Sequence, residues 1–347
     1  MVTMETMGLE PFTWRDGERT IRYGRGVLRD AVDVLGGPGY LLLTTERAAQ
    51  AAPHVVDAAA AVEHVRAGRV DEIAGELRER LGAAPAERLV ALGGGRAIDV
   101  AKALAAGSAG AARALAVPTT LSGAEMTAIH RPAAGVPRGT PTVRCAVVVN
   151  DPALSASQPD PALAASTLNA LGHAAEAPCT PLANPVATLA AHRAARLLAT
   201  AWPAVREPGT APGAPDRDAL ALGSLLAGYS IDSAHYGLHH VLSQTLVREA
   251  GAGHGPANAA MLPHSLGALA WRFPRQHEQL AAVFMEDPLA VVARLTTLAT
   301  ATRLRDIGVE AGVLAHCADV AAERAELDNT APRADRAELL ALYEAAW

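Results

Sequence analysis

Aromatic side chains are scarce in this chain of 347 residues, where Phe, Trp and Tyr together make up 3%. Hydrophobic residues nonetheless account for 50% of the chain, so a core must be built mainly from Ala, Leu and Val. Such a core suits packed helices better than an aromatic-rich β-sandwich. The same hydrophobic content excludes an intrinsically disordered chain.

Cysteine and positive charge are also in short supply. Cys145, Cys179 and Cys317 form an odd set without Cys-x-x-Cys spacing, which argues against a disulfide framework and against a zinc knuckle. Lys and Arg number 30 against 36 Asp and Glu, for a net charge of −6. A mildly acidic chain without basic runs argues against nucleic acid or an anionic membrane as the partner, which leaves small molecules.

Long apolar runs are missing as well. No stretch reaches the roughly 18 uninterrupted apolar residues of a membrane-spanning helix. The opening sequence, from Met1 to Thr20, has neither the cationic nor the apolar region of a signal peptide. We therefore expect a cytoplasmic protein that binds neither membranes nor nucleic acid.

The length predicts two domains, because single domains cluster near about 100–150 residues. Short apolar runs at 40–43, 88–92, 114–117 and 146–149 predict buried parallel strands, with crossover helices such as Asp71–Leu81 between them. After Asp151-Pro152 the pattern becomes Ala/Leu-rich and helical, and Glu207–Pro215 is typical of a surface loop. We predict a nucleotide-binding α/β domain over residues 1–155 and an all-helical domain over 156–347.

Two segments that follow strands are suited to binding phosphate. In Leu92–Lys102 a strand runs through Gly93, Gly94 and Gly95 into a helix, so bare backbone N–H groups can approach a pyrophosphate at the helix N-terminus. Val117–Thr127 is rich in hydroxyl groups and glycine, which can hold a phosphate or a nicotinamide amide. Neither has the spacing of the GxGxxG fingerprint, and the bland alternatives are a tight turn and a capped helix start.

Four polar residues stand out in the helical half. Asn169 and His173 are four residues apart and share a helix face. On one straight helix His240 and His254 would lie about 21 Å apart, but Gly251 and Gly253 should break the helix and let the imidazoles converge. The competing interpretation is that these histidines are structural, which is the commoner role of a single histidine.

Taken in order, these motifs resemble the iron-containing alcohol dehydrogenase superfamily, and its maleylacetate reductase branch most closely. The resemblance covers nearly the whole chain. It implies the fold shared with dehydroquinate synthase, with an N-terminal nucleotide-binding parallel-sheet domain, a C-terminal helical bundle and an active site between them. It also implies a nicotinamide cofactor and usually a homodimer. The residues that carry it are Tyr23–Gly26, Gly93–Lys102, Pro118–Thr127, Asn150–Pro152 and Asn329–Arg333.

The resemblance assigns the cofactor, NAD(H) or else NADP(H), to the α/β half. Thr45 would lie near the adenine ribose, where Glu46 favours NADH by repelling a 2′-phosphate. The expected cofactor-binding residues are Gly93, Gly94, Gly95, Arg96, Asp99, Lys102, Thr119, Thr120, Ser122 and Thr45.

Metal-binding members of the superfamily hold the ion with one Asp and three His, and those positions here are Asn169, His173, His240 and His254. Because the only anionic ligand is replaced by Asn, we expect no tightly bound metal. The maleylacetate reductase branch also has Asn at this position. We expect His240 and His254 to perform the polar catalytic work, and His173 and Asn169 to position the substrate.

Three residues depart from the branch pattern. Gln244 replaces a histidine that could relay protons, Arg96 replaces the serine of the glycine turn, and Ala124 replaces a serine on the nicotinamide side. The expected function is NAD(P)H-dependent reduction of a small conjugated keto or enone acid, with Arg138 as a further candidate anchor for its carboxylate. The alternatives are a metal-dependent alcohol or aldehyde dehydrogenase and a scaffold that has turned to non-redox chemistry or binding.

Overall fold

The computed structural model describes residues 10–203 and 213–347. The loop predicted at Glu207–Pro215 therefore lies outside the described residues as far as position 212. The described chain forms two compact units. The first comprises the residues up to Ser157 together with Arg217–Gly228, and the second comprises the rest, from Gln158 to Asp216 and from Tyr229 to Trp347.

The first unit is built on a sheet whose strands lie in the order β1-β2-β7-β6-β5-β3-β4. The predicted strands are confirmed as β3 (Tyr40–Thr44), β5 (Arg88–Gly93), β6 (Arg113–Pro118) and β7 (Val147–Asn150). All the described pairings are parallel except that of β1 with β2. The continuous apolar runs follow from this arrangement, because strands covered on both faces bury every side chain.

The sheet also contains three strands that the apolar runs did not reveal, β1 (Phe12–Asp16), β2 (Arg19–Tyr23) and β4 (Ala59–His64). β1 and β2 form an antiparallel hairpin that turns at Gly17, whose φ is +59°. Burial alternates along β1, and β4 is an edge strand with mostly exposed side chains. Such strands need no continuous apolar sequence.

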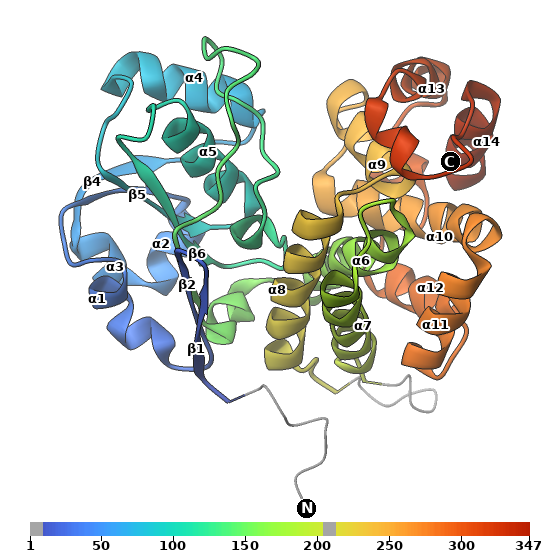
Figure 1. Cartoon of the computed structure of the whole chain (residues 1–347), viewed down its shortest axis with the longest axis horizontal. Helices are drawn as coiled ribbons and strands as arrows, with labels where there is room; N and C mark the ends of the chain where they lie inside the picture. Colours follow the sequence, from blue (N-terminus) through green and yellow to red (C-terminus); the bar gives the residue numbers. More distant parts are fainter. Residues whose placement is uncertain (1–9, 204–212) are drawn as a thin grey trace, which may run out of the picture. The chain divides into compact units, whose positions relative to one another are not determined.

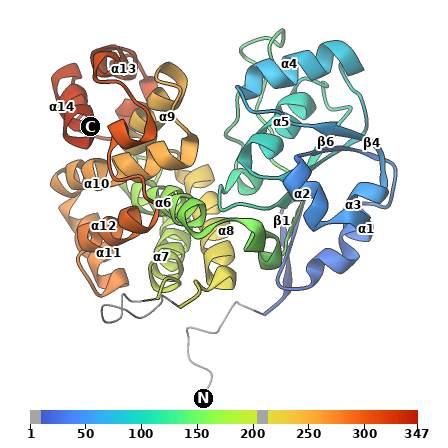
Figure 2. The ribbon, with the colours of Figure 1, turned by 180° about the vertical axis from the view of Figure 1, so that it is seen from behind.

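Helices cover both faces of this sheet, as Figures 1 and 2 show. α4 (Val70–Leu81), which confirms the predicted crossover helix, packs with α5 (Gly95–Ala106) on one face. α1 (Ala31–Val34), α2 (Glu46–Ala51) and α3 (Pro53–Asp57) lie on the other. After β4 the chain crosses back over β3 to β5, so its winding reverses between β3 and β5. Ligands of open α/β sheets bind at the carboxyl ends of the strands at such a reversal.

The second unit is helical, and no described residue after β7 forms a strand, which confirms the predicted α/β plus all-α class. Its helices are α6 (Asp160–Glu176), α7 (Pro185–Thr200), α9 (Leu238–Glu249), α10 (His254–Arg272), α11 (Pro274–Phe284), α12 (Pro288–Leu298), α13 (Leu314–Ala322) and α14 (Arg336–Ala346). α6 is largely buried and runs through the unit, where it packs against α7, α10 and α12 (Figure 1). A further helix, α8 (Arg217–Ala234), contributes residues to both units.

Within residues 10–203 and 213–347, every helix is too short or too polar to span a membrane.

Candidate functional site

The triple-glycine turn joins β5 to α5 at the reversal point of the sheet. Gly94 is the N-cap of α5, and no side chain caps the helix there, so its first N–H groups are open to a ligand. A Cβ on Gly94 would lie 3.0 Å from the Thr120 hydroxyl, and a Cβ on Gly95 would lie 3.0 Å from Cβ of Ser122. The glycines therefore serve a second purpose, because they let the loop after β6 pack directly on this turn.

Thr45 and Arg96 flank the turn. Thr45 follows β3 and is the N-cap of α2, where its hydroxyl accepts a hydrogen bond from the backbone N–H of Ala48 at 3.4 Å. β3 pairs with β5 in parallel, so Thr45 and the glycines both lie at the carboxyl ends of the strands. Arg96 lies exposed in the first turn of α5. Both predicted cofactor residues are thus located at the edge of the sheet where a nucleotide is expected.

Lys102 is fully buried. Its ammonium group donates to the backbone carbonyls of Ala124, Thr127 and Ile129 at 2.9–3.1 Å and forms an ion pair with Asp99 at 2.8 Å. These contacts fix the loop after β6 onto α5. Any effect of Lys102 on a cofactor therefore acts through the position of that loop.

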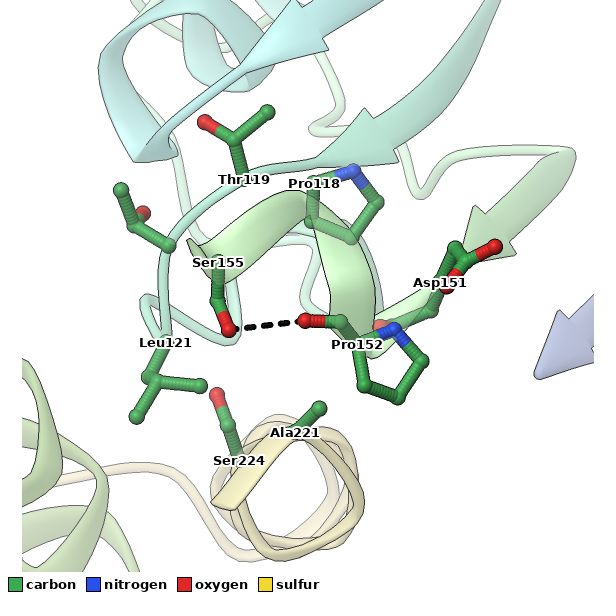
Figure 3. Close-up of a pocket in the computed structure, with 10 residues that line it drawn as sticks. Pro118, Thr119, Leu121, Asp151, Pro152, Ser155, Ala221 and Ser224 are labelled. Carbon is green, nitrogen blue, oxygen red and sulfur yellow. Dashed lines mark hydrogen bonds between the residues drawn. The ribbon is translucent and has the colours of Figure 1, made fainter. Parts of the chain in front are cut away.

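A small, partly open pocket lies at the carboxyl ends of β6 and β7 (Figure 3). Thr119 and Thr120 line it together with Asp151 and, from α8, Ser224. The hydroxyls of Thr119 and Ser224 are buried and have no hydrogen-bond partner among the described residues. These two hydroxyls can form hydrogen bonds with a polar ligand. The contribution of α8 was missed because about a hundred residues of sequence separate the two sides of the pocket.

In the helical unit three histidines form a buried cluster. The rings of His173 on α6 and His240 on α9 are stacked, with centroids 4.7 Å apart. The ring of His239 meets that of His240 edge-on at 4.9 Å. The predicted pair His173 and His240 therefore meets, and His239 adds a third imidazole to it.

Glu176 organises this cluster, and it was not among the predicted residues. Its carboxyl group is fully buried at the end of α6. One oxygen accepts the backbone N–H of His239 at 2.7 Å, and the other lies 2.6 Å from Nδ1 of His240. The sequence did carry a signal for it, since Glu176 follows His173 by three residues on an otherwise apolar helix face.

Burial controls the protonation of this group. Burial, with the positive charges of His254 and Arg324, lowers the pKa of His240 to about 3. Burial also lowers the pKa of His173 and raises that of Glu176. Nδ1 of His173 and Nε2 of His240 are buried without a hydrogen-bond partner among the described residues. Nε2 of His239 is likewise buried without one, so three ring nitrogens of the cluster lack a hydrogen-bond partner among the described residues.

The other two predicted residues lie near this cluster. Asn169 is buried on α6, one turn before His173. The predicted helix break at Gly251 and Gly253 is confirmed, because α9 ends at Glu249 and α10 begins at His254. His254 is the first residue of α10, and its charge contributes to the lowered pKa of both His173 and His240.

The C-terminal motif sets the start of α9. Thr330 accepts the backbone N–H of Leu238 at 3.0 Å, and the Asn329 amide donates to the carbonyl of Tyr236 at 2.8 Å. Gly237, the N-cap of α9, has no room for a Cβ beside the Thr330 hydroxyl. The motif therefore positions the helix that carries His240.

Gly172 on α6 provides a test of how tightly the cluster is packed. A Cβ at this position would lie 2.5 Å from Nε2 of His239, a ring held by a 2.8 Å contact between its Nδ1 and Ser265. We expect Gly172→Ala to lower the free energy of unfolding by about 1–3 kcal/mol, because the buried ring cannot move aside. Gly267→Ala on α10, where a Cβ meets nothing within 4 Å, is the matched control and should be neutral or stabilising. Equal denaturation midpoints for the two variants would contradict the packing described here.

The residues at the superfamily's metal positions do not form a conventional metal site. Within the two described ranges, no three His, Cys, Asp or Glu side chains are placed so that they could hold one ion. Asn169 replaces the one carboxylate of the metal-binding members and contributes no charge. A divalent ion would find little charge neutralisation in its first coordination shell.

A parallel-sheet unit with an open glycine turn and a helical unit with a buried histidine cluster together define a two-domain dehydrogenase architecture. Comparison with known families agrees with it. Residues 19–136 match the iron-containing alcohol dehydrogenase family, and residues 163–347 match the C-terminal part of the Fe-containing alcohol dehydrogenase family. The chain therefore belongs to the iron-containing alcohol dehydrogenase family and is an oxidoreductase.

Its relatives include several maleylacetate reductases. Maleylacetate reductase 1 of Rhodococcus opacus is 30% identical over 330 residues, which cover 90% of each chain. Maleylacetate reductase 2 of Cupriavidus pinatubonensis is 36% identical over 208 residues, 59% of this chain and 55% of that protein. The crystal structure of maleylacetate reductase from Agrobacterium tumefaciens superimposes with a TM-score of 0.79 at 27% identity, over 97% of this chain and 98% of that one.

Proposed function

We propose that this protein uses NADH, or else NADPH, to reduce the conjugated C=C bond of a small keto acid of the maleylacetate type. The observation that carries the proposal is the buried pair of Glu176 and His240, whose Nε2 has no partner of its own among the described residues. The similarity to maleylacetate reductases supports the choice of substrate class. Glu46, exposed in the first turn of α2, favours NADH.

The cofactor would bind at the sheet edge of the first unit. The open N-terminus of α5, with Gly93, Gly94 and Gly95, suits a pyrophosphate. The unsatisfied hydroxyl of Thr119 and the neighbouring pocket suit another part of the dinucleotide. When bound, the reduced nicotinamide supplies a hydride. The remaining candidates surround the turn. Thr45 follows β3, and Arg96 and Asp99 lie in the first turns of α5. Thr120 and Ser122 lie in the loop that Lys102 fixes.

The proton would come from the Glu176–His240 pair. Burial favours the electrically neutral form of the pair, in which one proton lies between Oε2 and Nδ1 and a second is on Nε2. Addition of hydride to one carbon of the substrate's C=C bond leaves an enolate. Nε2–H of His240 can stabilise that enolate and then protonate the adjacent carbon, which leaves the pair with one proton until solvent restores the other. His254 would supply a second donor, and His173 and Asn169 would position the substrate.

Cofactor binding at the glycine turn predicts a large effect of Gly94→Val. The added side chain would occupy the approach to the α5 N-terminus and press on Thr120, so we expect NADH affinity to fall at least about tenfold. Gly139→Val, in an exposed loop where a Cβ meets nothing within 4 Å, is the control and should bind NADH normally. Fluorescence titration measures both. Unchanged NADH affinity in a folded Gly94→Val protein would refute this site.

The side chains at the superfamily's metal positions predict activity without a bound metal. We expect dialysis against a chelator to leave the turnover rate unchanged, because Asn169 replaces the one anionic ligand that the metal-binding members supply. Asn169→Asp should increase the zinc or iron content of the purified protein. Elemental analysis that finds one metal per native chain, with activity lost on chelation, would favour the metal-dependent dehydrogenase instead.

A further inference from the structure

A second polar group lies in the helical unit beside the histidine cluster. It consists of Arg324, Glu326, Tyr236 and Gln244, which we call the Arg324 cluster. Nε and Nη2 of Arg324 donate to the two carboxylate oxygens of Glu326 at 3.0 and 2.6 Å. Nη2 also donates to the Tyr236 hydroxyl at 3.2 Å and to the Gln244 amide oxygen at 3.1 Å. The arginine side chain is only 10% exposed.

One part of this guanidinium is unused. Nη1 of Arg324 is buried and has no hydrogen-bond partner among the described residues, although its N–H groups are strong donors. Glu326, whose pKa is about 2, is ionised and occupies the Nε side of the group. A buried donor without an acceptor is unfavourable, and a guanidinium edge matches the two oxygens of a carboxylate. A bound carboxylate would supply the acceptor that Nη1 lacks.

The Arg324 cluster adjoins the proposed catalytic nitrogen. Gln244 lies one helical turn after His240 on α9, so the two residues share a face. The Tyr236 ring lies 5.7 Å from the His240 ring, centroid to centroid. The positive charge of Arg324 also lowers the pKa of His240. An anion held by Arg324 would therefore lie within one small molecule's length of Nε2 of His240.

We propose that Arg324 binds a carboxylate of the substrate, with Gln244 and Tyr236 holding the guanidinium in place. Arg324 thereby selects small dicarboxylates and directs their conjugated bond towards His240. The proposal rests on the function proposed above, and it identifies which residue recognises the acid. It also gives Gln244 a role, because an amide oxygen can accept from Arg324 without adding a competing positive charge.

Binding of maleate, a stable dicarboxylate, tests this role without turnover. Calorimetric titration of the NADH-loaded protein should show binding by the wild type that is weakened about 10- to 100-fold by Arg324→Met. Arg324→Lys keeps a charge for Glu326 but loses the fork, so it should fold normally and still bind at least severalfold more weakly. Arg336→Met, which removes an arginine that is half exposed and paired with Asp319, is the matched control and should bind as the wild type does. Wild-type affinity in both Arg324 variants, or no maleate binding by the wild type, would overturn the proposal.

Turnover separates recognition from a purely structural role. In Arg324→Lys we expect KM for maleylacetate to rise about tenfold while kcat and NADH affinity change little. A structural role predicts a lower melting temperature with KM unchanged, which would count against the proposal. If the wild type binds maleate through Arg324 but does not reduce maleylacetate, the proposed reaction fails while the assignment of Arg324 stands.

Discussion

His240→Ala is expected to reduce kcat/KM for maleylacetate by about 100-fold, while NADH affinity stays within twofold of the wild type. The variant removes both the donor to the enolate and the source of the proton, and general acid catalysis of this kind contributes roughly 10²- to 10⁴-fold. His254→Ala should cause a smaller loss of about tenfold, because it removes one hydrogen bond to the substrate. Steady-state kinetics, NADH titration and thermal melts of each variant provide the measurement.

His316→Ala is the control for these variants. His316 is an exposed histidine of the same unit that pairs with Glu249, and its removal should leave turnover unchanged. If the histidine cluster is only a packed core, His240→Ala will lose stability without a selective loss of turnover. A well-folded double variant, His240→Ala with His254→Ala, that turns over normally would end the catalytic assignment.

Glu176→Gln should lower kcat by about 100-fold with little change in KM, because loss of general acid–base catalysis typically costs about 10²- to 10⁴-fold. The amide can still accept the backbone N–H of His239, so α9 should keep its start. It cannot pass a proton to Nδ1 of His240 or accept one from it, and the pair no longer alternates between its two protonation forms.

The exposed Glu249→Gln is the control for this charge change, since its carboxylate only pairs with His316. Melting temperature separates the two possible roles of Glu176. A purely structural Glu176 would give an unstable protein with wild-type kcat, and that result would remove the buried pair from the mechanism.

The features that the sequence predicted are those encoded locally. Apolar runs marked β3, β5, β6 and β7 because strands covered on both faces need apolar side chains throughout. The helix break before His254 followed from Gly251 and Gly253, because two glycines so close together lower the stability of a helix there. The meeting of His173 with His240 was expected from the family resemblance, which assigns both residues to one site.

The features that were missed depend on partners distant in the sequence. Glu176 gains its role only when α9 places His240 beside it, 64 residues further along the chain. Arg324 meets Gln244 across 80 residues, and a basic residue in a polar turn gives no sign of this contact. Lys102 stays a predicted cofactor residue, and the contacts of its ammonium with three backbone carbonyls come from tertiary packing. Burial of this kind is a property of the fold and is not visible in a local pattern.

The reaction proposed for this protein is the reduction of a conjugated C=C bond with a hydride from a nicotinamide cofactor. Incubation of the chelator-treated wild type with NADH and maleylacetate, followed by identification of the product, tests it most directly. We expect one NADH to be oxidised per substrate and a product in which the C=C bond is saturated and the ketone is retained. No NADH oxidation, or a product in which the ketone has become an alcohol while the C=C bond survives, would contradict it.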